Sequence, residues 1–144
     1  MRWTSFFVGL MALAALASWS MGSSVSDRVA AEAAKSKSFE LQKLTSFEWR
    51  QAFVFSPYSL REQVCGALPA TWAQCASTYP TGVGEGSYLL AFVRDGMVIH
   101  HELHPRGNGE FCASGCVLQL TPQDAKFNVS SSVSGPKRFS KVAP

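Results

Sequence analysis

The three histidines of the chain fall close together, at His100, His101 and His104. Alternate residues of a β-strand lie on one face, so His100, Glu102 and His104 would share a face at a spacing of roughly 6–7 Å. Two imidazoles and a carboxylate can bind a divalent metal such as zinc. The commoner role of such a face is to carry polar side chains at the edge of a sheet or toward solvent. We therefore expect no cofactor, and keep the face of His100, Glu102 and His104 as an alternative metal site.

The four cysteines are Cys65, Cys75, Cys112 and Cys116. In an exported chain an even number of cysteines favours disulfides, and four cysteines allow three connectivities. The sequence alone does not decide among these three connectivities. We prefer the local pairs Cys65–Cys75 and Cys112–Cys116, since Pro69 bends the chain within the first pair and a short hairpin tip separates the second. Neither spacing matches a zinc knuckle or a thioredoxin-type redox motif.

One stretch of the chain resembles the active site of the L,D-transpeptidases. The residues that carry the resemblance are Val98-Ile99-His100, Gly115-Cys116-Val117 and Asp124-Ala125. These enzymes are exported and crosslink peptidoglycan through a cysteine acyl-enzyme. The resemblance implies that Cys116 is the nucleophile and His100 its base. The chain departs from the family where His101 replaces a glycine and where Ala113-Ser114 replaces Ser-His.

Other catalytic patterns are missing from the sequence, which contains no G-x-S-x-G, H-E-x-x-H or P-loop motif. Aromatic residues offer a different kind of site, because Trp and Tyr serve well as anchors at protein interfaces. Trp49, Tyr58 and Trp72 are the candidate binding residues. The net charge of +3 is too small to indicate a nucleic-acid partner.

The N-terminal segment determines the compartment. After Arg2 no charged residue occurs before Asp27, and residues 6–19 are almost wholly apolar. Residues 1–22 therefore read as a signal peptide, with small residues at Ser18 and Ser20 suited to cleavage. The alternative is an uncleaved membrane anchor, because residues 3–22 are long enough to span a bilayer. Either reading places the rest of the chain outside the cytoplasm, in the periplasm or secreted.

The remaining chain divides into three parts. Residues 23–38 are polar and Ala-rich and are expected to be a linker. Residues 39–130 are expected to form one α+β domain, a small antiparallel sheet with one main helix and two disulfides. Residues 131–144 are rich in Ser, Gly and Pro and are expected to be a basic, flexible tail.

Several elements can be placed within the domain. Strands are expected in 39–44, 49–55, 116–120 and 126–133, and a helix from Ser59 to about Leu68. Asp95-Gly96 predicts a type I′ hairpin between 87–94 and 97–103. In that register Val93 opposes Val98, Ala91 opposes His100 and Leu89 opposes Glu102. The face expected to meet the core consists of Leu90, Phe92, Ile99 and Leu103.

These observations favour a small exported domain without catalytic machinery. We expect it to bind a protein partner in the cell envelope or outside the cell, as an inhibitor or immunity-type factor or as an accessory to an envelope assembly. The alternatives are the transpeptidase-like enzyme and an exported metal-binding protein.

Overall fold

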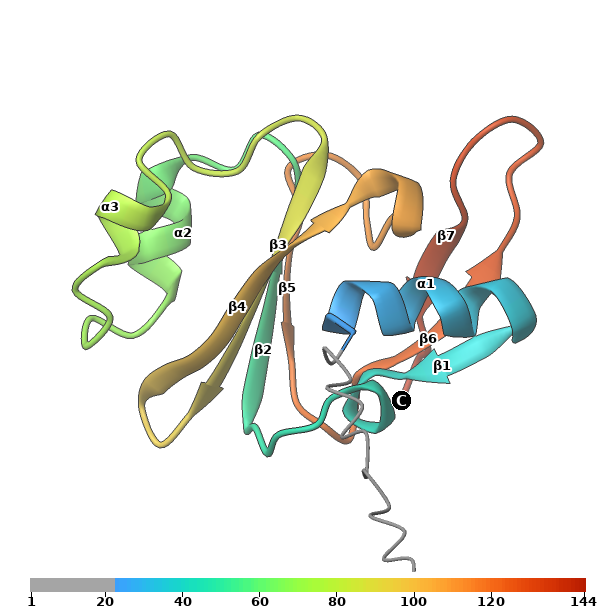
Figure 1. Ribbon diagram of the computed structural model, residues 1–144, viewed down its shortest axis with the longest axis horizontal. Coiled ribbons are helices and arrows are strands. Elements are labelled where there is room, and N and C mark those ends of the chain that lie inside the picture. The colour runs from blue at the N-terminus through green and yellow to red at the C-terminus, as the bar shows by residue number, and fades with distance from the viewer. Residues whose placement is uncertain (1–22) are drawn as a thin grey trace, which may run out of the picture.

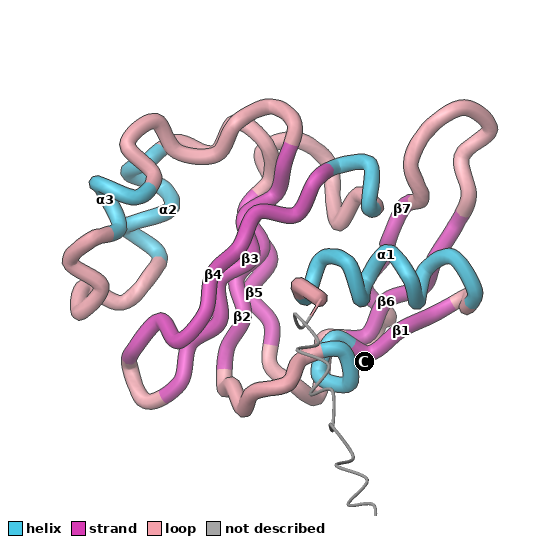
Figure 2. Tube along the Cα trace, viewed as in Figure 1, coloured by secondary structure: helices cyan, strands magenta, loops and turns pink. Residues whose placement is uncertain are grey.

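The computed structural model describes residues 23–144, and the predictions for residues 1–22 lie outside this range. Two antiparallel sheets dominate the fold (Figures 1 and 2). The larger has the strand order β4-β3-β2-β5, formed by β2 (Gln51–Phe55), β3 (Ser87–Arg94), β4 (Met97–Pro105) and β5 (Val117–Leu120). The smaller has the order β1-β6-β7, formed by β1 (Ser38–Glu40), β6 (Lys126–Ser130) and β7 (Arg138–Lys141). The predicted α+β class is confirmed, with more sheet than helix.

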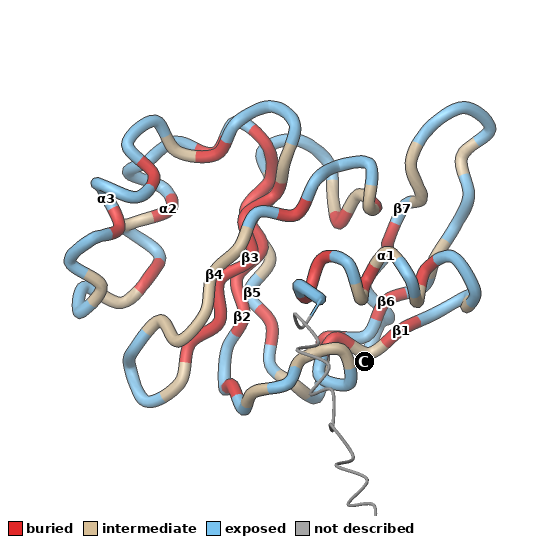
Figure 3. Tube along the Cα trace, viewed as in Figure 1, coloured by how far each residue is buried: buried red, intermediate tan, exposed pale blue. Residues whose placement is uncertain are grey.

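The four-stranded sheet is buried on both faces, which gives the molecule three layers. Leu89, Ala91 and Val93 of β3 pack on the side of the short helices α2 (Arg61–Ala67) and α3 (Cys75–Thr78). Leu90 and Phe92 pack on the opposite side, together with α1 (Val25–Lys35) and the three-stranded sheet. The buried segments accordingly follow β2 and β3 without alternation in Figure 3. Such a strand must be apolar throughout, as the sequence of β3 is.

The β3–β4 hairpin turns where it was predicted, at Asp95 (φ 51°) and Gly96 (φ 73°). The predicted register holds only at Val93–Val98. A bulge at Ile99 then shifts the pairing, so that Phe92 faces His100 and Leu90 faces Glu102. The predicted pairs of Ala91 with His100 and Leu89 with Glu102 are therefore wrong. The predicted core position of Leu103 is also wrong, because this side chain is exposed.

Residues 23–38 were expected to be a linker, but they contain α1. Ser24 caps the helix by accepting a hydrogen bond from the Asp27 amide at 3.0 Å. Val25, Val29 and Ala33 recur every four residues and are all buried. The linker prediction was wrong because it sought large apolar residues, whereas this helix packs through small ones.

The C-terminal segment also differs from the flexible tail that was expected. Arg138–Lys141 form β7, which pairs with β6 as an edge strand. Phe139 is buried against Phe39 and Phe111, with ring centroids 4.9 and 5.1 Å away. One buried aromatic residue within a polar segment thus holds the end of the chain in the fold.

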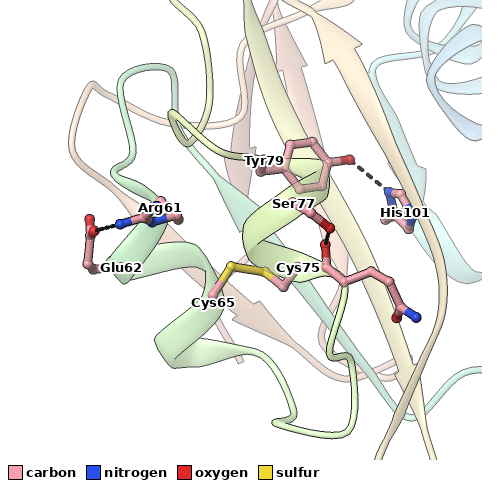
Figure 4. The surroundings of a disulfide bond; sticks show 8 residues. Arg61, Glu62, Cys65, Cys75, Ser77, Tyr79 and His101 are labelled. Atoms are coloured by element: carbon pink, nitrogen blue, oxygen red, sulfur yellow. Dashed lines mark hydrogen bonds and ion pairs between the residues drawn. A yellow bond between two sulfur atoms is a disulfide. The ribbon is translucent and has the colours of Figure 1, made fainter.

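Both preferred disulfides are present. Cys65–Cys75 links α2 to α3, with Cα atoms 5.8 Å apart (Figure 4), and Cys112–Cys116 closes the loop before β5. The two bonds indicate an oxidising environment, as outside the cytoplasm. The helix α2 begins slightly later than predicted, because Gln63 rather than Glu62 reaches back to the amide of Leu60.

Two 3₁₀ turns complete the fold. The turn η1 (Leu41–Leu44) replaces the second half of the first predicted strand, and η2 (Arg106–Asn108) follows β4. Within residues 23–144, no helix has the length and apolar character needed to cross a bilayer.

Candidate functional site

A cleft of about 490 Å³ lies where β3 begins and β4 ends. Its walls come from both sheets and from the connections around them: the loop after β2, the first turn of η2, residues 110–114, and the adjoining ends of β6 and β7. Sites for small molecules and short peptides commonly have roughly this size, 300–1,000 Å³.

Tyr58 stands at the rim of this cleft in an unusual backbone conformation. Its φ is 68°, in the left-handed region that bulky residues rarely adopt, and its side chain is 61% exposed. The Tyr58 amide donates to the Val83 carbonyl at 3.1 Å, and its hydroxyl donates to Glu85 Oε2 at 3.1 Å. The hydrogen bond to Glu85 raises the pKa of the Tyr58 hydroxyl. An exposed aromatic ring is therefore held in a fixed position at the rim.

The loop of residues 79–86 provides this support. Gly82 has φ 77°, and a side chain there would collide with the Ser59 carbonyl. Both backbone groups of Val83 are hydrogen-bonded to the loop after β2: its carbonyl accepts from the Tyr58 amide, and its amide donates to the Ser59 carbonyl at 2.9 Å. The glycine-rich sequence of this loop is thus explained by close backbone packing.

Three charged residues form the polar wall of the cleft. Arg106 donates two hydrogen bonds to Glu110 Oε1, from Nε at 3.1 Å and Nη2 at 2.7 Å. Arg138 Nε lies 3.9 Å from Glu110 Oε2. The interaction with Glu110 raises the pKa of Arg106. Glu110 is fixed through its backbone, because its amide donates to the Lys137 carbonyl and its carbonyl accepts from the Phe139 amide, both at 2.8 Å.

The apolar wall is equally rigid. Tyr88 is buried and its hydroxyl donates to the Cys112 carbonyl at 2.6 Å. The disulfide loop is also tied to Ser56, whose hydroxyl accepts from the Gly115 amide and whose amide donates to the Cys116 carbonyl. Burial raises the pKa of Tyr88, so the hydroxyl is neutral at ordinary pH.

The face of His100, Glu102 and His104, kept as an alternative metal site, instead holds the start of α1. Glu102 accepts hydrogen bonds from the amides of Val25 and Ser26, both at 3.0 Å, and from His100 Nε2 at 2.7 Å. Burial alone would raise the pKa of Glu102, but these hydrogen bonds outweigh it and lower the pKa. A carboxylate at the first turn also interacts favourably with the helix dipole.

His104 lies deeper under the same helix and is fully buried. Its Nε2–H donates to the Gly109 carbonyl at 2.9 Å, so its Nδ1 accepts from the Ser26 hydroxyl at 2.8 Å. Asn108 Nδ2 donates to the same Ser26 oxygen at 2.9 Å. Burial lowers the pKa of His104 to about 4. The Ser26–His104 pair has the contact of a nucleophile and its base, but both side chains are buried and fully engaged in holding α1.

No three side chains of His, Cys, Asp or Glu converge to form a metal site in residues 23–144. His100, Glu102 and His104 do share one face of β4, as the spacing predicted. That face is covered by the start of α1, which the sequence did not indicate.

The structure does not bring Cys116 and His100 together. His100 is on β4 and Cys116 precedes β5, and these strands are the opposite edges of a four-stranded sheet. Three strand spacings separate them, roughly 14 Å or more. The sulfur of Cys116 is also bonded to Cys112. The pair implied by the transpeptidase resemblance is therefore not assembled.

The three candidate aromatic residues lie in different surroundings. Trp49 is buried on Phe92 and donates from Nε1 to Thr45 Oγ1 at 3.0 Å. Trp72 is partly buried against His101, with centroids 4.6 Å apart. Among the three, Tyr58 alone is strongly exposed.

His101 belongs to a second polar contact, on the opposite face of β4. Its Nδ1 lies 2.8 Å from the Tyr79 hydroxyl, and Figure 4 shows the two side chains facing each other. Burial lowers the pKa of His101. This contact joins the segment after α3 to the sheet.

The charged residues of the cleft were missed by the sequence reasoning. Arg106, Glu110 and Arg138 are ordinary surface residue types, and Arg138 lay in the supposed tail. A parallel bridge between Glu110 and Arg138 brings them together. Parallel pairing of two short segments leaves no local signal in the sequence.

Comparison with known proteins found no matching family model, no similar curated protein and no similar solved structure.

Proposed function

We propose that the protein is an exported, non-catalytic binding domain that holds its partner at the cleft beside Tyr58. The partner is a protein of the cell envelope or one outside the cell, and the domain acts as an inhibitor or immunity-type factor or as an accessory to an envelope assembly.

The observation that carries this proposal is the fixed, exposed ring of Tyr58. An aromatic side chain that is already ordered loses little conformational entropy on binding, which is why such residues are frequent anchors at interfaces. The backbone cost of a left-handed tyrosine is retained in a structure when the surroundings enforce it, and such positions cluster at functional sites. Two arginines beside it add polar groups that can orient a partner.

Export is the second part of the proposal. The disulfides support it, and the sequence of residues 1–22 is that of a signal peptide. We favour cleavage and release, and the alternative is retention of residues 3–22 as a membrane anchor. The intact mass of the protein from its native envelope distinguishes these two, because only an anchored protein keeps Met1.

Site-specific photo-crosslinking tests the use of the cleft. A benzophenone amino acid replaces Tyr58 in one variant and Met97 in another, and cells are irradiated before the envelope is solubilised. Met97 is a matched control, since it is 60% exposed but lies at the β3–β4 turn, at the opposite end of β3 from the cleft.

We expect an adduct of defined mass from position 58 and none from position 97. Added wild-type protein should compete for this adduct, while added Tyr58→Ala protein should compete about tenfold less well, the usual effect of removing an aromatic anchor. Adducts that are equal at both positions, or absent at position 58, would contradict the proposal.

A further inference from the structure

We infer that the cleft recognises a carboxylate with an adjacent apolar group, presented by an extended peptide segment of the partner. This inference rests on the proposed binding function and names the chemistry of the ligand.

Arg138 is the side chain available for the carboxylate. Its side chain is 71% exposed, and its only ion pair among the described residues is the 3.9 Å contact from Nε to Glu110, which is too long for a hydrogen bond. The terminal nitrogens of this guanidinium have no partner within residues 23–144. A guanidinium offers two parallel donors to a carboxylate, and this pairing is both stronger and more directional than a single ion pair.

Glu110 is the carboxylate nearest to both guanidiniums. Its backbone is fixed by hydrogen bonds to Lys137 and to Phe139 of β7, and its side chain is mostly covered. Arg106 is committed to it through two hydrogen bonds. Glu110 is therefore paired with Arg106, and the terminal nitrogens of Arg138 keep their donors for a ligand.

The charge balance favours a carboxylate over a phosphate. The described residues that line the cleft include two guanidiniums and one carboxylate, a net charge of +1. One incoming carboxylate balances this charge, whereas a phosphate with nearly two negative charges at neutral pH would leave an excess. Glu85, which accepts from Tyr58 at the rim, further disfavours a doubly charged anion.

The rest of the cleft is mixed, with the serines Ser114, Ser130 and Ser140 beside apolar and aromatic side chains, and the aromatic part selects the second group. The ring of Phe139, the buried ring of Tyr88 and the exposed ring of Tyr58 are adjacent to the arginines. Since Tyr88 and Phe139 are already buried, an aromatic or aliphatic group next to the carboxylate would pack mainly on the exposed ring of Tyr58. A peptide supplies this combination through a terminal apolar residue or through an acidic side chain next to an apolar one.

Two small probes separate the charge from the apolar group. N-acetylphenylalanine carries a carboxylate beside an aromatic ring, and N-acetylphenylalaninamide has the same shape without the charge. Each is titrated into the ¹⁵N-labelled protein, residues 23–144 with disulfides intact, and the signals of the arginine Nε–H groups and the backbone amides are followed. A third probe, the amide of N-acetyl-aspartyl-phenylalanine, distinguishes a side-chain carboxylate from a terminal one.

We expect saturable shifts at Arg138 and at the amides around Tyr58 with the acid, and an affinity for the amide that is lower by about tenfold or more. Arg138→Gln should weaken binding of the acid about tenfold. Arg138→Lys should recover only part of the loss, because lysine lacks the two parallel N–H donors of a guanidinium. Arg94→Gln is the matched control, since Arg94 is a partly exposed arginine at the far end of β3, with only long contacts to Asp95 and to the Glu48 carbonyl. It should bind as the wild type does.

Equal affinities for acid and amide, or full binding by Arg138→Gln, would overturn the inference. So would the absence of any saturable shift with all three probes. The proposed function fails separately. If position 58 gives no crosslink in the protein with Arg138 intact, both proposals are rejected. If it gives a crosslink that Arg138→Gln leaves unchanged, the binding function is kept and the carboxylate is rejected.

Discussion

Acidification should destabilise this protein through His104 well before its carboxylates are protonated. The imidazole is fully buried, and its Nδ1 accepts a hydrogen bond from Ser26 under the start of α1. A proton on Nδ1 would place a positive charge in this closed site and replace an acceptor by a donor. Burial accordingly lowers the pKa from 6.5 to about 4.

Proton uptake by the unfolded chain determines the direction of this pH dependence. Between pH 6.5 and 4 the unfolded chain binds a proton at His104 that the folded protein does not bind, so the free energy of unfolding falls as the pH falls. The slope approaches about 1.4 kcal/mol per pH unit, and the total loss by pH 4 is about 3 kcal/mol. Above pH 7.5 this residue should contribute no pH dependence. Such a loss is a large fraction of the stability of a domain of this size, about 5–15 kcal/mol.

Urea unfolding followed by tryptophan fluorescence measures this loss at several pH values from about 7.5 to about 4.5. The comparison is His104→Gln, whose amide can donate to the Gly109 carbonyl and accept from Ser26 but does not titrate. We expect this variant to be less stable at pH 7.5 and to show a shallower pH dependence. The lowered pKa of His101 acts in the same direction in both proteins and cancels in the difference. Identical slopes in the two proteins, or an NMR titration of His104 near its ordinary pKa, would refute the reasoning.

Two further changes test the supports described above. Gly82→Ala should destabilise the protein by about 2 kcal/mol or more, because φ there is 77° and the methyl group would meet the Ser59 carbonyl. The control is Gly84→Ala, at a position with open space, which should cost less than about 1 kcal/mol. Thermal unfolding of both variants measures the two losses. Glu102→Gln should destabilise by about 1–2 kcal/mol at pH 7, because a neutral amide binds the first amides of α1 less strongly. The loss should shrink only as the pH falls below 4.5, the ordinary pKa of a glutamate, toward the lowered pKa of Glu102, because the wild type then loses the same negative charge. Equal effects of the two glycine changes, or a pH-independent effect of Glu102→Gln, would contradict these assignments.

Local signals in the sequence predicted the local features of the fold. Asp95-Gly96 specifies the hairpin because both turn positions need positive φ, and the structure has them there. The disulfides follow from the short separations within each cysteine pair. The bulge at Ile99 was not predictable, since nothing in an alternating apolar pattern marks an extra residue. That one residue placed His100, Glu102 and His104 on the face that meets the core.

The partners of these elements were harder to predict, because they depend on packing between distant segments. The helix α1 has a polar composition and gains its stability from tertiary contacts through Val29 and its neighbours. The edge strand β7 depends on one phenylalanine, Phe139, which packs against Phe39 of β1, His104 of β4 and Phe111 of the loop before β5. For the same reason the arginines of the cleft were not recognised as a site.

The buried histidine and the cleft are parts of one arrangement. His104 holds the carbonyl of Gly109, and the next residue is Glu110, which accepts hydrogen bonds from Arg106 and lies 3.9 Å from Arg138 Nε. Gly109 has φ 127°, and a side chain there would overlap the ring of Phe139, which itself lines the cleft. Ser26 of α1 binds both His104 and Asn108, so the helix once taken for a linker fixes the turn η2 from which Arg106 projects. If the cleft binds its partner as proposed, protonation of His104 should weaken that binding together with stability, because a proton on Nδ1 removes the acceptor of the Ser26 hydroxyl, and Ser26 also holds Asn108 of η2.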